Sequence, residues 1–342
     1  MRIGQWLGLL TLIVSLYILW QIRQLVLLLF TAVVLAVAIN QLVRRFRRSG
    51  MKRAGAVWLS LGIAIALLFV SFWLIIVPFI NQFQDLVELL PSGIEQIRQA
   101  INWLEQQVAP FLPEVPDLNQ IIQQIQPYIA NLPAQMLAFF STSVGALLEF
   151  LLVLILTLMI LVNPQPYRKA FIRCFPAFYR KRVDEILTRC ADGLGAWTVG
   201  ALIEMVFIGA LSGIGLWILQ VPLALAHAVL AGLLNFIPNI GPTLSVFLPA
   251  TIAFLDAPWK ALAVIVLYII IQNVESYWLT PTVMAHQVAL LPAVTLTAQI
   301  FFTTFFGALG LLMALPLAVV AKTWIEEALF KDILDRWQHS SS

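Results

Sequence analysis

The chain has 342 residues, of which 61% are hydrophobic and only 11% are charged, and its mean hydropathy is +0.93. A soluble domain carries roughly 25% charged residues, so this chain has too little charge to cover a water-facing surface. Its net charge is +3 and its bases lie beside apolar runs, which does not favour nucleic-acid binding. The composition predicts an all-α integral membrane protein whose partner is the lipid bilayer.

Four apolar runs in the first half are long enough to cross a hydrocarbon core of ~30 Å as helices. They are residues 3–20, 25–43, 54–80 and 138–162. The first run has no small-residue cleavage site before Gln21, so we expect a retained helix rather than a signal peptide.

The segments between these runs differ in charge. Residues 44–53 hold six bases and no acid, and residues 163–192 hold seven bases, whereas residues 81–137 hold one base and six acids. By the positive-inside rule the basic segments are cytoplasmic and the acidic segment is outside. Four spans with a cytoplasmic N-terminus satisfy this arrangement.

Two segments outside the spans read as amphipathic helices. In residues 81–137, isoleucines and leucines recur at three- and four-residue spacing, which predicts an external helical cap or oligomerisation element. A substrate-access role is the alternative for this segment. Residues 167–194 combine aromatic residues with bases, which suits a helix at the headgroup level, although a solvated charged face would give the same pattern.

The C-terminal half contains two long apolar segments that are broken near their centres. Residues 222–255 are interrupted by the sequence NFIPNIGP, and residues 291–324 carry Gly307 and Gly310 in the middle. Each arm has about 14 residues and covers roughly 21 Å, which is short for a crossing. Full spans are expected at 199–219 and 259–279.

If both broken segments are re-entrant hairpins, a span followed by a hairpin occurs twice in opposite orientation. This polytopic bundle with two re-entrant hairpins in an inverted repeat is typical of transporters, with the hairpin tips facing each other near the midplane. The alternative is one kinked helix at 222–255, which gives eight spans. Both alternatives place the C-terminus in the cytoplasm.

The sequence thus divides into five segments. They are three N-terminal transmembrane helices (1–80), an extracytoplasmic amphipathic segment (81–137), a fourth span with a basic cytoplasmic helix (138–198), a transport core (199–324) and a cytoplasmic tail (325–342).

Polar residues at membrane depth are the candidates for function, because a charge there costs about 2.5–3.5 kcal/mol. Gln272 and Glu275 share a helix face, and Glu275, with Glu204 as the second candidate, is expected to carry a proton. An interfacial glutamate that is paired or hydrated is the alternative for each. A buried, hydrogen-bonded side chain is expected for His227, and His286 is expected in a cytoplasmic loop.

The predicted substrate or ion pathway is lined by polar and helix-breaking residues, which could instead cap half-helices. They are Asn235, Pro238, Asn239, Gly241, Pro242, Thr243, Gln272, Asn273, Glu275, Gln299, Thr303, Gly307 and Gly310, with Thr304 beside them.

The sequence lacks the motifs of several classes of enzyme. The sequence has no GxxxxGK[ST] loop for ATP, no HExxH zinc helix and no GxSxG elbow, and its histidines and cysteines are scattered. We therefore expect neither an enzyme nor a cofactor or metal site. An intramembrane enzyme, a passive channel and a membrane scaffold are the rival functions.

The chain resembles the autoinducer-2 exporter family of bacterial permeases over essentially its whole length. The resemblance rests on NFIPNIGP at 235–242, Gln272-Asn273-Val274-Glu275, Thr280-Pro281, Phe306-Gly307-Ala308-Leu309-Gly310, Pro316 and Glu326-Glu327. It implies a multi-pass protein of the bacterial inner membrane. It also implies a secondary exporter of a small polar or amphiphilic molecule, such as a signalling molecule, with coupling to H⁺ or Na⁺ open. A Na⁺/H⁺ antiporter is the alternative within the family, and a homo-oligomer is expected.

Overall fold

The computed structural model describes residues 10, 13–15, 17–75, 132–284 and 291–334. Every regular element in these ranges is a helix, and five of the helices are long and apolar enough to cross a membrane. A sixth span results if a sharply bent helix pair is counted as one. Most of the predicted first span and external segment, together with His286, lies outside the described residues.

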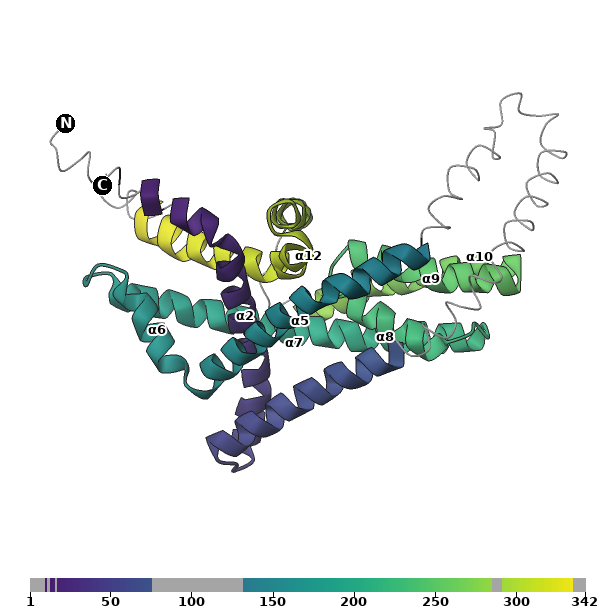
Figure 1. Cartoon of the computed structure of the whole chain (residues 1–342), viewed down its shortest axis with the longest axis horizontal. Helices are drawn as coiled ribbons and strands as arrows, with labels where there is room; N and C mark the ends of the chain where they lie inside the picture. Colours follow the sequence, from purple (N-terminus) through teal and green to yellow (C-terminus); the bar gives the residue numbers. More distant parts are fainter. Residues whose placement is uncertain (1–9, 11–12, 16, 76–131, 285–290, 335–342) are drawn as a thin grey trace, which may run out of the picture.

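The N-terminal part consists of α2 (Arg23–Arg48), the helix Arg53–Ile75 and α5 (Leu132–Val162). The predicted span at 138–162 therefore begins earlier than expected, at Leu132. Helices α2 and α5 pack against each other, and the helix Arg53–Ile75 joins them through Ala56 and Val57 (Figure 1). The far end of that helix leaves Phe69 and Trp73 about three-fifths exposed, at 61% and 59%. In a bilayer, such exposed apolar side chains face the lipid tails.

The basic segment after α5 folds differently from the prediction. Helix α6 (Pro164–Arg173) is bent by 93° from the end of α5, and α7 (Arg180–Ile218) begins only after a short turn. The single amphipathic helix expected over 167–194 was therefore wrong. Pro176 disfavours helical backbone at Phe175, which separates α6 from α7. Helix α7 then continues through the predicted span without interruption; its 39 residues cover ~58 Å, so part of it must extend beyond the hydrocarbon core.

The first broken segment is a helical hairpin. It consists of α8 (Ala224–Leu234) and α9 (Ile240–Asp256), which pack against each other. Val221, before α8, lies in one hydrophobic cluster with Ala253, near the end of α9, so the chain reverses direction at the break. This reversal rules out one continuous kinked helix in the folded chain. Re-entry into the membrane remains a prediction, because it depends on where the bilayer lies.

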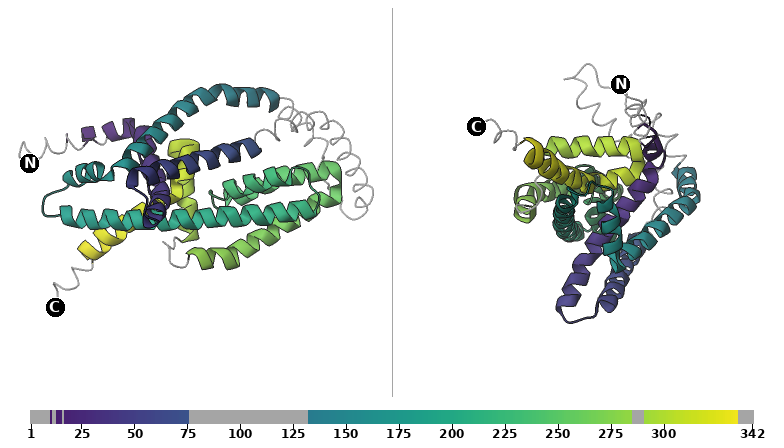
Figure 2. Two further views of the ribbon diagram at one scale, coloured as in Figure 1. Left: turned by 90° about the horizontal axis from the view of Figure 1, so that it is seen from below. Right: turned by 90° about the vertical axis from the view of Figure 1, so that its left-hand side faces the viewer.

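Helix α9 is followed by α10 (Pro258–Val274), the π-helical turn η1 (Glu275–Leu279) and α11 (Thr280–Met284). These elements run alongside α9 and α7, and together with α8 they form the elongated half of the molecule (Figure 2). Apolar side chains from α7, α8, α9 and α10 share the core of this half, with Leu216 and Val264 fully buried.

The second broken segment is α12 (Pro292–Trp324), which continues into the π-helical η2 (Ile325–Leu334). Gly307 interrupts α12 with non-helical backbone (φ 65°, ψ −147°). A Cβ on Gly310 would lie 2.1 Å from the carbonyl oxygen of Phe302, although residues eight apart on a straight helix are separated by ~12 Å. The helix therefore folds back sharply at Gly307, and its two arms, 292–306 and 308–324, point in different directions (Figure 2).

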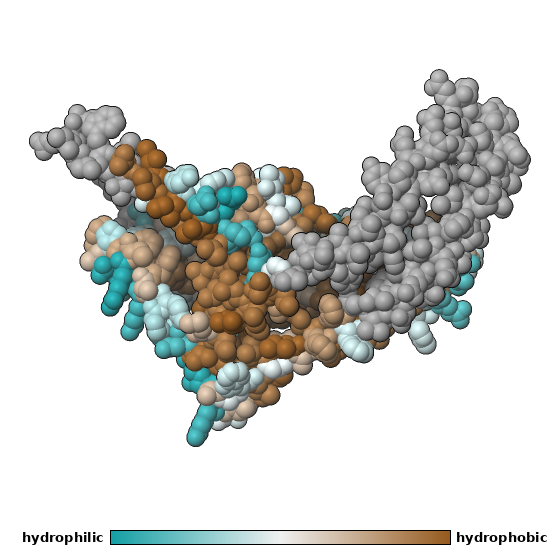
Figure 3. All heavy atoms as spheres, viewed as in Figure 1, coloured by the Kyte–Doolittle hydropathy of each residue, from teal (hydrophilic) through white to brown (hydrophobic). Residues whose placement is uncertain are grey.

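Glycines allow α7 and α8 to approach closely. A Cβ on Gly232 of α8 would lie 2.5 Å from the Met205 carbonyl oxygen of α7, and one on Gly209 would lie 3.1 Å from the Ala228 carbonyl oxygen. Such close contact between small residues is a common way to pack helices in lipid. This close packing holds the first hairpin against α7. The visible face of the assembled helices is largely apolar at its centre, and hydrophilic side chains gather toward its edges (Figure 3).

Candidate functional site

The break in the first hairpin is a strained turn centred on Asn239. Its backbone (φ 68°, ψ −48°) lies close to that of a classic γ-turn, a rare conformation, and the Ile240 N–H donates to the Pro238 carbonyl oxygen at 2.8 Å. Two residues on, Gly241 leaves no room for a side chain, because a Cβ there would lie 1.9 Å from the Leu234 carbonyl oxygen. Asn239 and Gly241 thus shape the turn. The Asn239 side chain is exposed.

Glu275 is held by two side-chain amides from different elements. Asn235, at the end of α8, donates from Nδ2 to Glu275 Oε1 at 2.8 Å, and Gln272, one turn earlier on α10, donates from Nε2 to Oε2 at 2.9 Å. Asn235 is 6% exposed and Glu275 is 8% exposed. The predicted shared face of Gln272 and Glu275 is therefore present, and the first hairpin reaches it through Asn235.

Glu204 lies close to this carboxylate on α7. It is also only 8% exposed, and Thr280 Oγ1 donates to Glu204 Oε1 at 3.2 Å. Glu204 and Glu275 interact electrostatically with each other. The turn η1 helps to bring the two together, because its wider winding lets the Thr280 N–H donate to the Glu275 carbonyl oxygen five residues earlier. π-Helical turns of this kind are frequent at functional sites.

The second broken helix contacts the first break directly. Gln299, in the first arm of α12, donates from Nε2 to the Pro238 carbonyl oxygen at 2.8 Å, so this oxygen accepts two hydrogen bonds. Gln299 is 2% exposed. A hydrophobic cluster adds a second link: Phe236 stacks edge-on against Trp197 at 5.3 Å between ring centroids, and Phe306, beside the break in α12, packs on the same cluster.

The site is polar, acidic and free of basic partners among the described residues. No Lys, Arg or His lies within ion-pairing distance of Glu204 or Glu275 in the part of the chain that the structure describes. The amide oxygens Asn235 Oδ1 and Gln299 Oε1 are buried and accept no hydrogen bond from described residues. Two carboxylates with the unused amide oxygen of Asn235 can bind a proton, a small cation or the hydroxyl groups of a polar solute. No group of three or more His, Cys, Asp or Glu side chains with metal-site geometry occurs among the described residues.

The side chains of the other residues predicted for the pathway form no hydrogen bond with Glu275 or Glu204 in the described part of the chain, and their place in the pathway stays a prediction. Their side chains bond within their own segments: Asn273 to the Ile269 carbonyl, Thr243 to Asn239, Thr303 to Gln299 and Thr304 to Ile300. Pro242 follows Gly241 in the first turn of α9, and Gly307 and Gly310 act through the backbone. His227 is buried in α8, at 1% exposure, as expected, and its hydrogen bond stays a prediction.

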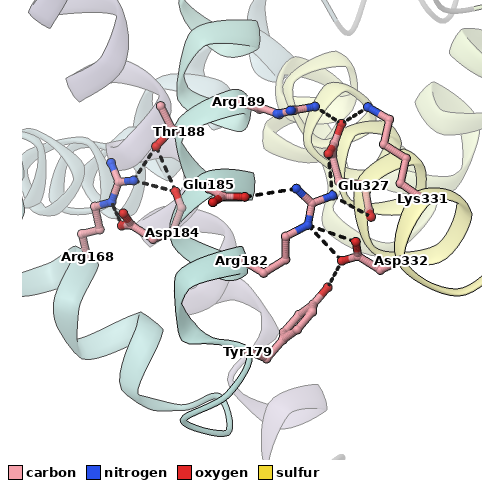
Figure 4. A network of polar contacts seen from close by, with 10 residues as sticks. All are labelled: Arg168, Tyr179, Arg182, Asp184, Glu185, Thr188, Arg189, Glu327, Lys331 and Asp332. Atoms are coloured by element: carbon pink, nitrogen blue, oxygen red, sulfur yellow. Dashed lines mark hydrogen bonds and ion pairs between the residues drawn. The ribbon is translucent and has the colours of Figure 1, made fainter. Parts of the chain in front are cut away.

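Sequence reasoning missed one member of the site and one cluster outside it. Thr280 was recognised in the family resemblance but not as a partner of Glu204, and the spacing of five residues from Glu275 gives no signal without the π-helical turn. The missed cluster joins the start of α7 to η2, where Glu327, with its side chain only 5% exposed, pairs with Arg182, Arg189 and Lys331 (Figure 4). Complementary charges in Arg180-Lys181-Arg182 and Glu326-Glu327 were the available signal.

Arg182 is the centre of that cluster. Its guanidinium also bonds to Asp332 at 3.0 Å and to Glu185 at 3.2 Å, and the Tyr179 hydroxyl donates to Asp332 (Figure 4). The end of the second broken helix is thereby tied to α7, the helix that carries Glu204.

Comparison with known proteins agrees with this architecture. The family model described as the AI-2E family transporter matches residues 9–330. Among similar proteins, YueF of Bacillus subtilis (strain 168) is 27% identical over 71% of this chain and 68% of its own length. YhhT of Escherichia coli (strain K12) is 25% identical over 89% of this chain and 84% of its own length. The AI-2 transport protein TqsA of the same strain is 26% identical over 86% of this chain and 84% of its own length. A family match over almost the whole chain, on a helical fold with five to six candidate spans, shows that this multi-pass membrane protein belongs to the AI-2E transporter family.

Proposed function

We propose that this permease is a secondary exporter of a small polar or amphiphilic molecule, and that Glu275 and Glu204 couple export to H⁺ or Na⁺. The observation that carries the proposal is the position of Glu275, which is buried and bonded to Asn235 from the break of the first hairpin. Ionisable groups inside helical membrane proteins are costly and generally mark substrate or ion pathways.

The hydrogen bonds at Glu275 explain how a bound cation would change the position of the first hairpin. Asn235 donates to the carboxylate, so charge on Glu275 holds the end of α8 in place. Protonation of Glu275, or binding of Na⁺ beside it, weakens this charge-assisted bond. The occupancy of one carboxylate then biases the position of the first hairpin.

The contact between Gln299 and Pro238 extends this bias to the second broken helix. Movement of the first break strains or releases the hydrogen bond that Gln299 makes with it. Broken helices that meet in this way support a mechanism in which the two hairpins, with α7 and α10, rock against a scaffold of N-terminal helices. The polar groups around Glu275 provide hydrogen-bond partners for a solute.

The substrate proposal follows from the relatives. The name of TqsA describes AI-2 transport, and the polar lining of the site here suits a solute with several hydroxyl groups. We place the protein in a bacterial inner membrane with both termini in the cytoplasm, because the basic segments lie there by the positive-inside rule. The homo-oligomer remains a prediction that cross-linking in native membranes tests.

Transport in proteoliposomes tests the coupling. A proton or sodium gradient should drive solute movement in the wild type, and Glu275→Gln should reduce gradient-driven flux at least about tenfold, the factor given by a loss of 1.4 kcal/mol. Asp192→Asn, which neutralises an exposed carboxylate on α7, is the matched control and should keep wild-type flux.

The rival functions predict other outcomes. Solute flux that ignores both gradients in the wild type would point to a passive channel. Exchange of Na⁺ for H⁺ without any solute would identify an antiporter. Hydrolytic turnover of a membrane substrate would identify an enzyme. Wild-type flux in Glu275→Gln would remove Glu275 from the coupling mechanism.

A further inference from the structure

An open cavity, which we call the elbow cavity, lies along one face of α6 beside the bend that follows α5, and the transport site does not use it. Its volume is about 400 Å³, and it is lined by Asn163, Gln165, Pro166, Lys169, Ala170 and Arg173. All but Asn163 come from α6, and they recur at three- and four-residue spacing, so they share one face of that helix. Lys169 and Arg173 give this face two positive charges.

Helix α6 is held in place from its other sides. Arg168 bonds to Asp184 at 2.6 Å and to Thr188, both on α7 (Figure 4). Phe171 contacts Phe175, which in turn stacks on Trp324 at the end of α12. These contacts fix the rotation of α6, and they involve neither Lys169 nor Arg173.

The two cations in the elbow make no ion pair with the described residues. Lys169 and Arg173 are exposed, and no carboxylate in the described part of the chain lies within 4.0 Å of either. Their α6 neighbour Arg168, by contrast, is paired. A cavity that gathers two uncompensated cations and two amides is complementary to an anion with several acceptor oxygens.

The bend places this cavity where such an anion is abundant. Helix α6 runs at 93° to α5, so it lies along the membrane surface if α5 crosses the membrane. The neighbouring turn between α2 and the helix Arg53–Ile75 is also basic, and Arg53 reaches the end of α5 by donating to the Leu161 carbonyl oxygen at 3.4 Å. The elbow is therefore at the headgroup level, beside a basic surface.

We propose that the elbow cavity binds the phosphate headgroup of an anionic phospholipid, held by Lys169 and Arg173 with Asn163 and Gln165 as further donors. The lipid would fix the angle between α5 and α6. Through Arg168 and Asp184 it would also steady the start of α7. Direct contact with the phosphate gives each base a charge-assisted hydrogen bond, which contributes a factor of at least about ten in affinity, so the pair should contribute at least about a hundredfold.

Lipid retention tests the site. The full-length protein is reconstituted in bilayers of equal parts phosphatidylglycerol and phosphatidylcholine, and the lipids that remain bound are counted by native mass spectrometry. The wild type should retain phosphatidylglycerol selectively, and Lys169→Gln with Arg173→Gln should reduce that selectivity at least about a hundredfold. The control, Arg47→Gln with Arg48→Gln, removes two exposed bases of the neighbouring basic turn, outside the cavity. It should lower the selectivity by no more than the factor of about five per base that a nearby charge contributes without contact.

Two outcomes would overturn the proposal. Equal selectivity in the wild type and the Lys169 and Arg173 double variant would show that the elbow binds no headgroup. Equal loss in both double variants would show a general charge effect rather than a site. Competition by soluble glycerol phosphate would distinguish the source of the anion: full displacement of the lipid would identify a site for a soluble phosphate instead.

Discussion

The side-chain amide of Gln299 donates a hydrogen bond to the Pro238 carbonyl oxygen, joining two broken helices whose breaks are 68 residues apart, at Asn239 and Gly307. Gln299 is 2% exposed and Pro238 is half-buried, and the bond is a direct polar contact between the two broken helices. Its removal is therefore expected to affect how the hairpins move together.

Gln299→Leu should lower the stability of the protein in detergent by about 1 kcal/mol and slow solute transport. The loss is limited because the Pro238 oxygen keeps its bond from the Ile240 N–H. Thermal unfolding and proteoliposome flux measure the two effects. The control is Thr304→Val, which removes a hydroxyl that bonds only within its own helix; equal effects of both variants would contradict a specific link between the hairpins.

Gly307→Ala should destabilise the protein by about 1–3 kcal/mol, because only glycine adopts its backbone angles readily. The control is Gly62→Ala, which lies inside a regular helix and should stabilise it by about 0.5–1 kcal/mol. An added Cβ meets nothing within 4 Å at either position, so the comparison isolates backbone strain from crowding. Thermal unfolding measures both variants, and melting temperatures that shift in the same direction would contradict strain at Gly307.

Asn239 should tolerate glycine and reject a branched residue. Its positive φ of 68° costs an L-residue roughly 1–2 kcal/mol, so Asn239→Gly relieves strain and Asn239→Val increases it. If Asn239 serves as the centre of the turn, Asn239→Gly keeps transport. A glycine variant that folds normally but no longer transports would instead assign the side chain to the pathway.

Glu327→Gln should destabilise the contact between α7 and η2 by about 2 kcal/mol, because three cations share this shielded carboxylate. Glu326→Gln is the matched control: its side chain is 51% exposed and reaches Lys322 only at 3.6 Å, so the expected change is below about 0.5 kcal/mol. High salt should narrow the difference between the two variants in thermal unfolding. Equal melting temperatures of the two variants would show that the ion pairs of Glu327 do not stabilise the fold.

The sequence alone was sufficient for the helical class, the approximate spans and the two breaks. Apolar run length reports directly on membrane helices, and Pro238 and Gly307 interrupt helices for local reasons. Asn235, Gln272 and Glu275 were all selected as polar groups at membrane depth. What connects them could not be predicted, because the meeting of Asn235 and Glu275 depends on how α8 and α10 each pack against α7 and α9.

The failures share a physical cause. The start of α7 at Arg180 depends on a local turn around Pro176, which the apolar pattern does not reveal. The pairing of Arg182 with Glu327 joins residues 145 apart, so only the folded chain brings their charges together. Thr280 reaches Glu204 from the element that follows the π-helical turn, and sequence periodicity assumes regular winding.

The backbone at Gly307 has a consequence for chirality. Its angles of 65° and −147° are close to the mirror image of polyproline II, the conformation that an L-residue adopts freely at the opposite signs. The position therefore suits a D-amino acid. Among the residues that the ribosome incorporates, achiral glycine adopts these angles most readily. Chemical ligation of D-alanine at this position should preserve the stability that L-alanine lowers, so the handedness of a single carbon at residue 307 sets the strain of the break in α12.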